Sequence, residues 1–467
     1  MPTLDFKGKP FVYSHHLSVP FRELVVDASK SVPPAGEAPG LDGNLIIHGD
    51  NLEALKALLP RYAGKVDVIY IDPPYNTGNE GWAYNDNVNA PQLKAWLGKT
   101  VDADDMERHD KWLCMMWPRL QLLRELLSET GVILVSMDET EISLLYSAMD
   151  EIFGSDNRFE NIIWKKRYGG GPKEKFFVNL HEYVLVYAKS KSVITKIDRP
   201  LTPEKIERYY KWTDDTQTGS AELRSILGPD AFPYPKPSSL LSTILEAKFH
   251  PTDNANVLVL DSFAGSGTTA HAVLALNKAD GGNRKFILVE TEDYADALTA
   301  ERVRRVIKGV PGAKDAALKD GLGGSFTFCE LGEPMDMERF FAEDGKAPSW
   351  DQVARYVAYT ATGETLTRAE GEDGFAGHAG PYRLHLLYRD DPKWMRSNDA
   401  MLDLTTAERI AAAAQADGGK PVLVFAAGKL MGQRALTDLG ITFCQLPYSV
   451  HRILGDGSEG VAGVDAA

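Results

Sequence analysis

The 467-residue sequence has few cysteines, no long apolar segment and fewer basic than acidic residues. Its three cysteines, Cys114, Cys329 and Cys444, are far apart, so the spacing indicates neither a metal site nor a disulfide framework. No apolar run approaches the roughly 20 residues of a membrane-spanning helix, and the opening residues lack the pattern of a secretory signal. We therefore expect a cytoplasmic protein without a bound metal, and not a membrane protein or a disulfide-rich secreted one.

The shortage of positive charge is uneven. A formal net charge of −15 argues against nucleic-acid binding by the surface as a whole. Residues 161–200 nevertheless contain nine basic and three acidic side chains. Phosphate binding needs a local basic surface rather than a basic protein, although a solvated loop would have the same composition. Most of this charge lies in the glycine-rich stretch 164–175, on Lys165, Lys166, Arg167, Lys173 and Lys175.

Continuous apolar segments alternate with amphipathic ones over most of the chain. The apolar segments are rich in β-branched residues, as in VDVIYID (66–72) and KFILVE (285–290). Strands covered on both faces have this pattern, and strand–helix alternation predicts a parallel, doubly wound α/β sheet. The length calls for two or three domains. We expect a lead-in at 1–44, a main domain at 45–320 and a smaller C-terminal α/β domain at 321–467.

A glycine loop follows one predicted strand in VLVLDSFAGSGTTAHAV, residues 257–273. Gly265 and Gly267 let the backbone approach a ligand, and the helix that begins near Thr268 offers unpaired N–H donors. The loop matches neither a dinucleotide fingerprint nor a P-loop, and by itself it could be a tight turn. The next strand ends in Glu290, which can accept both hydroxyls of a ribose. Together these features predict an adenosyl ligand.

A second constellation, IDPPYNTGN, closes the predicted strand at 66–72. Pro73 and Pro74 stiffen the segment and remove two N–H donors. Asp72 and the carbonyl of Pro73 can then accept both hydrogens of one NH2 group, while Tyr75 offers a flat face for stacking. A rigid turn with a packed tyrosine is the structural alternative. Ligands usually bind at the carboxyl ends of parallel strands, which favours the functional interpretation.

These two motifs resemble those of the DNA amino-methyltransferases. Asp-Pro-Pro-Tyr precedes the glycine loop, which is the permuted order of the beta class. Further stretches resemble the modification subunits of type III restriction systems, over about residues 44–310. They are HGDN (48–51), RHDKWL (108–113), GVILVSMDET (131–140), HEYVLVYAK (181–189) and FPYPKPSSLL (232–241). A Rossmann-like methyltransferase sheet with circularly permuted motifs is the fold that the resemblance implies.

The resemblance also implies roles for individual residues. Asp72, Pro73, Pro74 and Tyr75 would hold a flipped adenine for direct methyl transfer from S-adenosylmethionine to its N6 amine. The basic residues of 164–175 are expected to contact DNA phosphates. The cofactor would be bound by Asp50, Lys236, Asp261, Phe263, Ala264, Gly265, Ser266, Gly267, Thr268, Thr269 and Glu290, with Lys236 near its methionine carboxylate.

Several alternatives remain open at this point. A methyltransferase acting on cytosine N4, RNA or a protein glutamine would use similar motifs, although Asp72 favours adenine. A non-catalytic DNA-binding modification subunit is a further alternative. The target-recognition insert expected from the resemblance is short here, at residues 190–231, which leaves the recognition sequence undefined. The expected partners are double-stranded DNA, a restriction or helicase subunit and a second copy of the chain.

Overall fold

The computed structural model describes residues 3–77, 107–166, 180–194, 216–229, 231–246, 257–335 and 347–446. The chain divides into two compact units. Unit 1 comprises Met1–Pro20, Leu24–Lys56 and Gly64–Gly332, and unit 2 comprises Phe21–Glu23, Ala57–Ala63 and Glu333–Ala467. Within the described residues, no helix is both long and apolar enough to cross a membrane.

Unit 1 is built on a nine-stranded sheet with the strand order β1-β9-β2-β8-β7-β3-β4-β6-β5. The strands from β9 to β4 that have a recorded register run parallel, while β6 is antiparallel to both β4 and β5. The strands are β1 (Arg22–Val32), β2 (Leu45–His48), β3 (Val66–Ile71), β4 (Leu127–Met137), β5 (Ile162–Lys165), β6 (His181–Ala188), β7 (Leu258–Asp261), β8 (Lys285–Glu290) and β9 (Phe326–Pro334).

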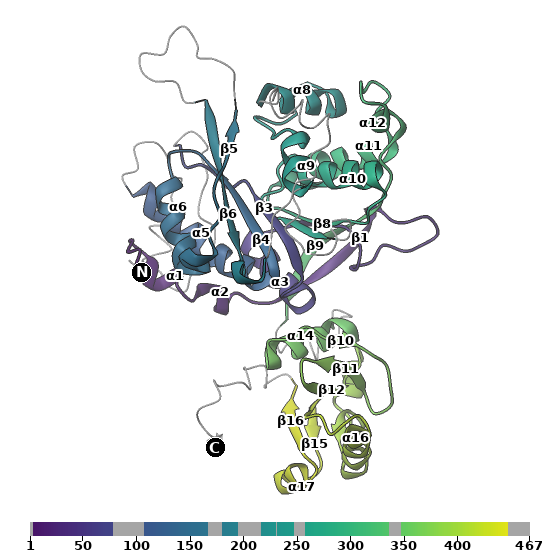
Figure 1. Ribbon diagram of the computed structural model, residues 1–467. Coiled ribbons are helices and arrows are strands. Elements are labelled where there is room, and N and C mark those ends of the chain that lie inside the picture. The colour runs from purple at the N-terminus through teal and green to yellow at the C-terminus, as the bar shows by residue number, and fades with distance from the viewer. Residues whose placement is uncertain are drawn as a thin grey trace. The chain divides into compact units, whose positions relative to one another are not determined.

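The sheet is buried on both faces, as the continuous apolar strands predict. Ile46 and Val68 point into a core shared with residues of the helices that flank β7. Their neighbours Ile47 and Ile69 point to the other face and are equally buried. The predicted doubly wound α/β sheet is therefore confirmed, and Figure 1 shows helices to both sides of it.

The larger helices connect consecutive strands. Helix α5 links β3 to β4, α6 follows β4, and α10 links β7 to β8 (Figure 1). The helices are α1 (Lys9–Val12), α2 (His15–Ser18), α3 (Asn51–Tyr62), α5 (Arg108–Leu126), α6 (Ile142–Met149), α8 (Thr216–Leu227), α9 (Ser238–Glu246), α10 (Thr268–Asp280), α11 (Glu301–Lys308) and α12 (Ala316–Asp320).

Two strands at one edge of the large sheet lie outside the range 45–320 expected for the main domain. Strand β1 lies within the predicted lead-in 1–44, and β9 lies beyond the predicted boundary at residue 320. Because β9 pairs with β2 in register, it belongs to the first sheet. The glycine-rich run before β9 is a connection inside unit 1 rather than a linker between the units. Polar residues are scattered along β1 because it is an edge strand, and so its sequence lacks the buried-strand pattern.

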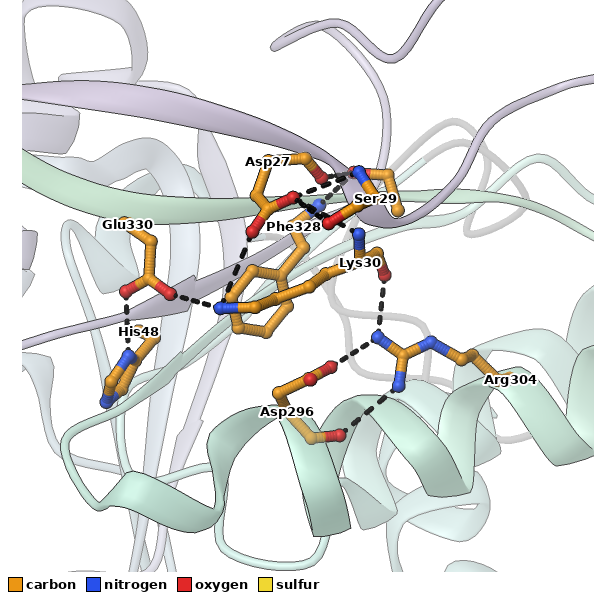
Figure 2. A network of polar contacts seen from close by, with 9 residues as sticks. Asp27, Ser29, Lys30, His48, Asp296, Arg304, Phe328 and Glu330 are labelled. Carbon is orange, nitrogen blue, oxygen red and sulfur yellow. Dashed lines mark hydrogen bonds and ion pairs between the residues drawn. The ribbon is translucent and has the colours of Figure 1, made fainter.

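A polar network joins β1 to its neighbours, as Figure 2 shows. The Lys30 ammonium on β1 lies 2.7 Å from Glu330 Oε1 on β9, and His48 Nδ1 on β2 lies 2.7 Å from Glu330 Oε2. The Arg304 guanidinium of α11 donates a 2.7 Å hydrogen bond to the Lys30 carbonyl. Side chains of β9 and α11 thus contact the edge strand directly, and His48 of β2 holds Glu330 in place.

Unit 2 contains a five-stranded sheet with the order β10-β11-β12-β14-β16. Strands β12, β14 and β16 are parallel, and β10–β12 pair antiparallel. Its strands are β10 (Thr367–Arg368), β11 (Phe375–Ala379), β12 (Tyr382–Leu387), β13 (Met401–Leu402), β14 (Val422–Ala426), β15 (Gly428–Lys429) and β16 (Ile441–Gln445). Its helices are α14 (Trp350–Thr362), α15 (Pro392–Met395), α16 (Leu404–Ala416) and α17 (Gln433–Asp438).

Candidate active site

The two sequence motifs meet at the centre of the large sheet. Strands β3 and β7 are parallel neighbours, with Val68 opposite Val259 and Ile69 opposite Leu260. The Asp-Pro-Pro-Tyr segment and the glycine loop, although far apart in sequence, therefore leave the sheet side by side, at the carboxyl ends of β3 and β7. From β7 the chain goes on to β8 on one side, and from β3 it goes on to β4 on the other. The point between β7 and β3 is therefore a topological switch point, where α/β sheets bind ligands.

A cavity of about 1550 Å³ opens at this edge. Its volume exceeds the roughly 300–1,000 Å³ of a typical small-molecule pocket, which leaves room for two ligands. Most of the predicted site residues line it: Asp50, Asp72, Pro73, Pro74, Tyr75, Lys166, Lys236, Asp261, Phe263, Ala264, Gly265, Ser266, Thr268, Thr269 and Glu290.

The Asp-Pro-Pro-Tyr segment is held from behind by helix α5. Trp112, which is fully buried, donates a 2.7 Å hydrogen bond from Nε1 to the carbonyl of Pro74. The next residue, Asn76, is buried in the left-handed conformation at φ 61° and donates to the Glu141 carboxylate. Glu141 also contacts His109 at 2.6 Å, and burial raises the pKa of its carboxyl group. The RHDKWL motif thus supports the segment that it follows in sequence.

The Asp72 carboxylate is paired with a buried lysine. Lys236 Nζ lies 2.9 Å from Asp72 and 2.9 Å from the Tyr75 hydroxyl. Glu182 of β6 lies 3.3 Å from the same ammonium and accepts a 3.1 Å hydrogen bond from the Tyr75 hydroxyl. Although burial lowers the pKa of Lys236, the charges of Asp72 and Glu182 outweigh it and raise that pKa. Burial and the same two carboxylates also raise the pKa of Tyr75, which keeps it a phenol.

The Lys236 ammonium lies on Asp72 and Tyr75. The position near the methionine carboxylate of a cofactor, which the resemblance implied, stays a prediction. Lys236 precedes α9, and its carbonyl accepts a 3.2 Å hydrogen bond from Thr268 at the start of α10. The backbone of Lys236 thus contacts one motif and its side chain reaches the other.

The glycine loop is organised by two buried carboxylates. Glu290 Oε2 accepts a 2.7 Å hydrogen bond from Gly265 N, and Glu290 Oε1 accepts one from Glu292 N. Asp261 accepts from Phe263 N at 3.1 Å and from the Thr269 hydroxyl at 2.5 Å. Burial raises the pKa of Glu290, and it raises that of Asp261 to about 7 despite these hydrogen bonds.

Both loop glycines have positive φ, 50° at Gly265 and 76° at Gly267. A Cβ on Gly265 would lie 3.2 Å from the ring tip of Phe232, which lines the cavity. A Cβ on Gly267 would lie 3.1 Å from the Thr299 carbonyl and would also touch Val303. Gly267 does not line the cavity, so its side-chain position faces the packing under α11 rather than the space for a ligand.

Arg302, which is fully buried, fixes the start of α10 from behind the loop. Its guanidinium donates hydrogen bonds of 2.9 Å to the hydroxyls of Ser266 and Thr268, and it lies 3.6 Å from Glu222 of α8. Burial opposes the charge of Glu222, but His271 and Arg302 outweigh it and hold the pKa of that carboxyl well below its usual range.

The predicted DNA-contacting residues are only partly described. Lys166 lines the cavity and lies 3.6 Å from Glu182, and Lys165 is exposed on β5. Arg167, Lys173 and Lys175 lie outside the described residues.

Sequence reasoning gave no role to Glu182, Trp112, Glu141 or Arg302. Glu182 and Trp112 lie in motifs that carried the resemblance. The signal available was an acidic residue in the largely apolar HEYVLVYAK and an aromatic residue in the largely charged RHDKWL. For Arg302, within ERVRRVIK, we find no such signal.

Comparison with known proteins agrees with this geometry. The sequence profile of a family described as DNA methylase matches residues 66–301. The chain is 29% identical over 399 residues to the StyLTI Mod subunit, a type III restriction-modification enzyme of Salmonella typhimurium. That alignment covers 60% of this chain and 59% of the relative. The EcoPI Mod subunit of Escherichia phage P1 is 27% identical over 420 residues, covering 60% of this chain and 64% of the relative.

The chain thus spans about three-fifths of the length of these two relatives. Among solved structures, the complex of M1.HpyAVI with S-adenosylmethionine aligns with 20% identity and a TM-score of 0.34, covering 56% of this chain and 98% of that one. A score so low adds nothing to the assignment. The matched segment 66–301 is half of the chain and contains both motif loops, which confirms the resemblance: the chain belongs to the DNA methylase family.

Proposed function

We propose that this protein is an S-adenosylmethionine-dependent DNA methyltransferase that modifies the N6 amine of adenine within a restriction-modification system. One observation carries the proposal. The Asp-Pro-Pro-Tyr segment and the glycine loop share one cavity at the switch point of the sheet, with volume for a cofactor and a base.

The glycine-loop half of the cavity fits the proposed cofactor. Glu290 and Asp50 line it at the ends of the neighbouring strands β8 and β2, where carboxylates can accept ribose hydroxyls and an adenine amine. Asn51 Oδ1 and Ser262 Oγ also belong to lining residues, are buried, and make no hydrogen bond within the described part of the chain. Buried polar atoms without partners are costly, so these two are available to a polar ligand.

S-adenosylmethionine, held in the glycine-loop half of the cavity, would supply an electrophilic methyl group to the target amine, with S-adenosylhomocysteine as the leaving group. Asp72 and the Pro73 carbonyl accept the two amine hydrogens, which directs the lone pair of the amine at the methyl group. The nitrogen becomes positively charged, and the Asp72 carboxylate stabilises this charge until one proton passes to solvent. Tyr75 stacks on the flipped base, a contact worth ~1–3 kcal/mol.

The proposed partners follow the names of the relatives. Both are Mod subunits of type III restriction-modification enzymes, which supports double-stranded DNA as substrate and a restriction or helicase subunit as partner. A cytoplasmic location and pairing with a second copy of the chain belong to the same proposal. So does the division into a methyltransferase domain and a C-terminal domain, with residues 190–231 as a short target-recognition insert.

The test is methylation of unmodified genomic DNA with isotopically labelled S-adenosylmethionine. Nucleoside analysis of the product should show N6-methyladenine. Labelled N4-methylcytosine would show that the target base is cytosine and not adenine. Label on RNA or protein but not on DNA would overturn the substrate class, and absence of transfer would favour a non-catalytic subunit.

A further inference from the structure

Glu182 lies in the base-binding half of the cavity, where no role was assigned to it. It is 8% exposed and contacts three groups: the Lys236 ammonium, the Tyr75 hydroxyl and, at 3.6 Å, the Lys166 ammonium. Lys236 is therefore held between two carboxylates, Asp72 and Glu182, and its ammonium lies 5.0 Å from the centre of the Tyr75 ring.

The ammonium occupies the acceptor that the proposed substrate needs. Lys236 donates to Asp72 at 2.9 Å and lies at the same distance from its second carboxylate oxygen. A target amine must donate to this carboxylate as well, so Lys236 has to give way when a base enters. Its side chain is only 12% exposed, and releasing a buried ammonium without an anionic partner would be strongly unfavourable.

We propose that Glu182 is a positioning residue that receives the Lys236 ammonium when the target amine displaces it from Asp72. The inference rests on the proposed function, since it concerns the same amine. Glu182 is already 3.3 Å from the ammonium, so the exchange needs a small movement of one flexible side chain. Lys236 thus covers Asp72 in the absence of a base, and Glu182 keeps the charge paired in its presence.

The exchange predicts a particular pattern of stability. Either carboxylate alone should hold the ammonium, so Asp72→Asn and Glu182→Gln should each cause a moderate loss of stability in urea. The Asp72→Asn/Glu182→Gln double variant leaves the buried ammonium without a carboxylate. We expect its loss to exceed the sum of the single losses. Strict additivity would show that the two carboxylates do not share Lys236, and this readout needs no catalytic activity.

The exchange also predicts a particular pattern of rates. At saturating S-adenosylmethionine, Glu182→Gln should lower kcat on genomic DNA by about tenfold or more. The lower end of the free energy of a hydrogen bond to a charged group corresponds to about a tenfold change in rate. S-adenosylmethionine affinity, measured by calorimetry, should stay unchanged. In a Lys236→Met background no ammonium has to be received, so the same substitution should lower kcat much less.

The control is Glu151→Gln, which removes a partly buried carboxylate, 21% exposed, from its 2.7 Å ion pair with Lys9. It should leave kcat unchanged. An equal effect of Glu182→Gln in both backgrounds would overturn the role through Lys236. If the wild-type protein transfers no methyl group to any DNA, the proposed function fails, and the urea measurements still decide whether Glu182 and Asp72 share the lysine.

Discussion

The two halves of the cavity hold their carboxylates in different ways. In the glycine-loop half, Asp261 and Glu290 accept hydrogen bonds from backbone N–H groups and from a threonine hydroxyl. In the Asp-Pro-Pro-Tyr half, Asp72 and Glu182 are paired with the ammonium of one lysine side chain. Backbone donors cannot move without moving the loop, whereas a lysine side chain changes partners by rotation. One half is therefore built to be fixed and the other to rearrange.

Asp72→Ala should produce the largest effect, a loss of kcat, and should affect only the Asp-Pro-Pro-Tyr half of the cavity. Removing a group that stabilises developing charge lowers kcat by roughly 10²–10³-fold. S-adenosylmethionine affinity should stay near the wild-type value, because the proposed role of Asp72 is to bind the target amine and not the cofactor. Single-turnover methylation and calorimetry on the same preparation check both statements. A variant that keeps more than a tenth of the wild-type rate would remove Asp72 from the mechanism.

Alanine substitutions at the two loop glycines should affect protein stability and S-adenosylmethionine affinity to different degrees. Each residue has positive φ, so alanine costs roughly 1 kcal/mol at either position. Gly267→Ala also meets the Thr299 carbonyl and should lower the melting temperature more. Gly265→Ala meets Phe232 in the cavity wall and should weaken S-adenosylmethionine binding more. The reverse ranking in both measurements would contradict the positions of the two side chains.

Asp261→Asn should remove a pH-dependent loss of stability that arises in the glycine-loop half of the cavity. The pKa of Asp261 is raised to about 7, so the folded protein keeps a proton that the unfolded chain loses near pH 4. Wild-type stability due to this group therefore falls as pH rises from about 4 to about 7, by at most about 1.4 kcal/mol per pH unit. The melting temperature of Asp261→Asn relative to wild type should rise across this range. A constant difference would rule out the shifted pKa.

Trp112→Phe should have a smaller effect on the rearranging half. It removes the hydrogen bond to the Pro74 carbonyl while keeping an aromatic ring in the core. A hydrogen bond contributes about 0.5–1.5 kcal/mol, so we expect kcat to fall a few-fold without loss of cofactor affinity. Steady-state kinetics with a melting curve distinguishes this result from unfolding. An unchanged kcat would mean that the hydrogen bond from Trp112 is not needed to fix the segment.

Neutralising Lys166 and Arg167 together should have the least selective effect, because phosphate contacts carry no base information. Binding to all DNA sequences should weaken about equally. The salt dependence of binding should become shallower by roughly one unit per lost phosphate contact. If the slope of DNA affinity against sodium chloride concentration is unchanged, residues 164–175 are an ordinary solvated loop.

The sequence predicted the two motif loops because each combines a strand end with residues of restricted backbone geometry. Asp72 and Glu290 could be placed at one sheet edge from this pattern alone. The position of Lys236 could not, since the direction of a long side chain depends on which carboxylates surround it. Glu182 was hidden for the same reason, because its partners Tyr75, Lys166 and Lys236 come from three other segments. The place of β1 in the sheet was missed because pairing with β9, about 300 residues later, leaves no local pattern.

The edge of the large sheet has a consequence for synthesis. Among the described strands of the large sheet, β1 leaves the ribosome first, yet β9, the strand that joins it to the sheet, leaves last. During that interval β1 has neither its strand neighbour nor the Glu330 partner of Lys30. An unpaired strand in a growing chain is exposed to aggregation. A chain terminated at residue 320 would remain in that state, whereas one extended through residue 335 can close the sheet.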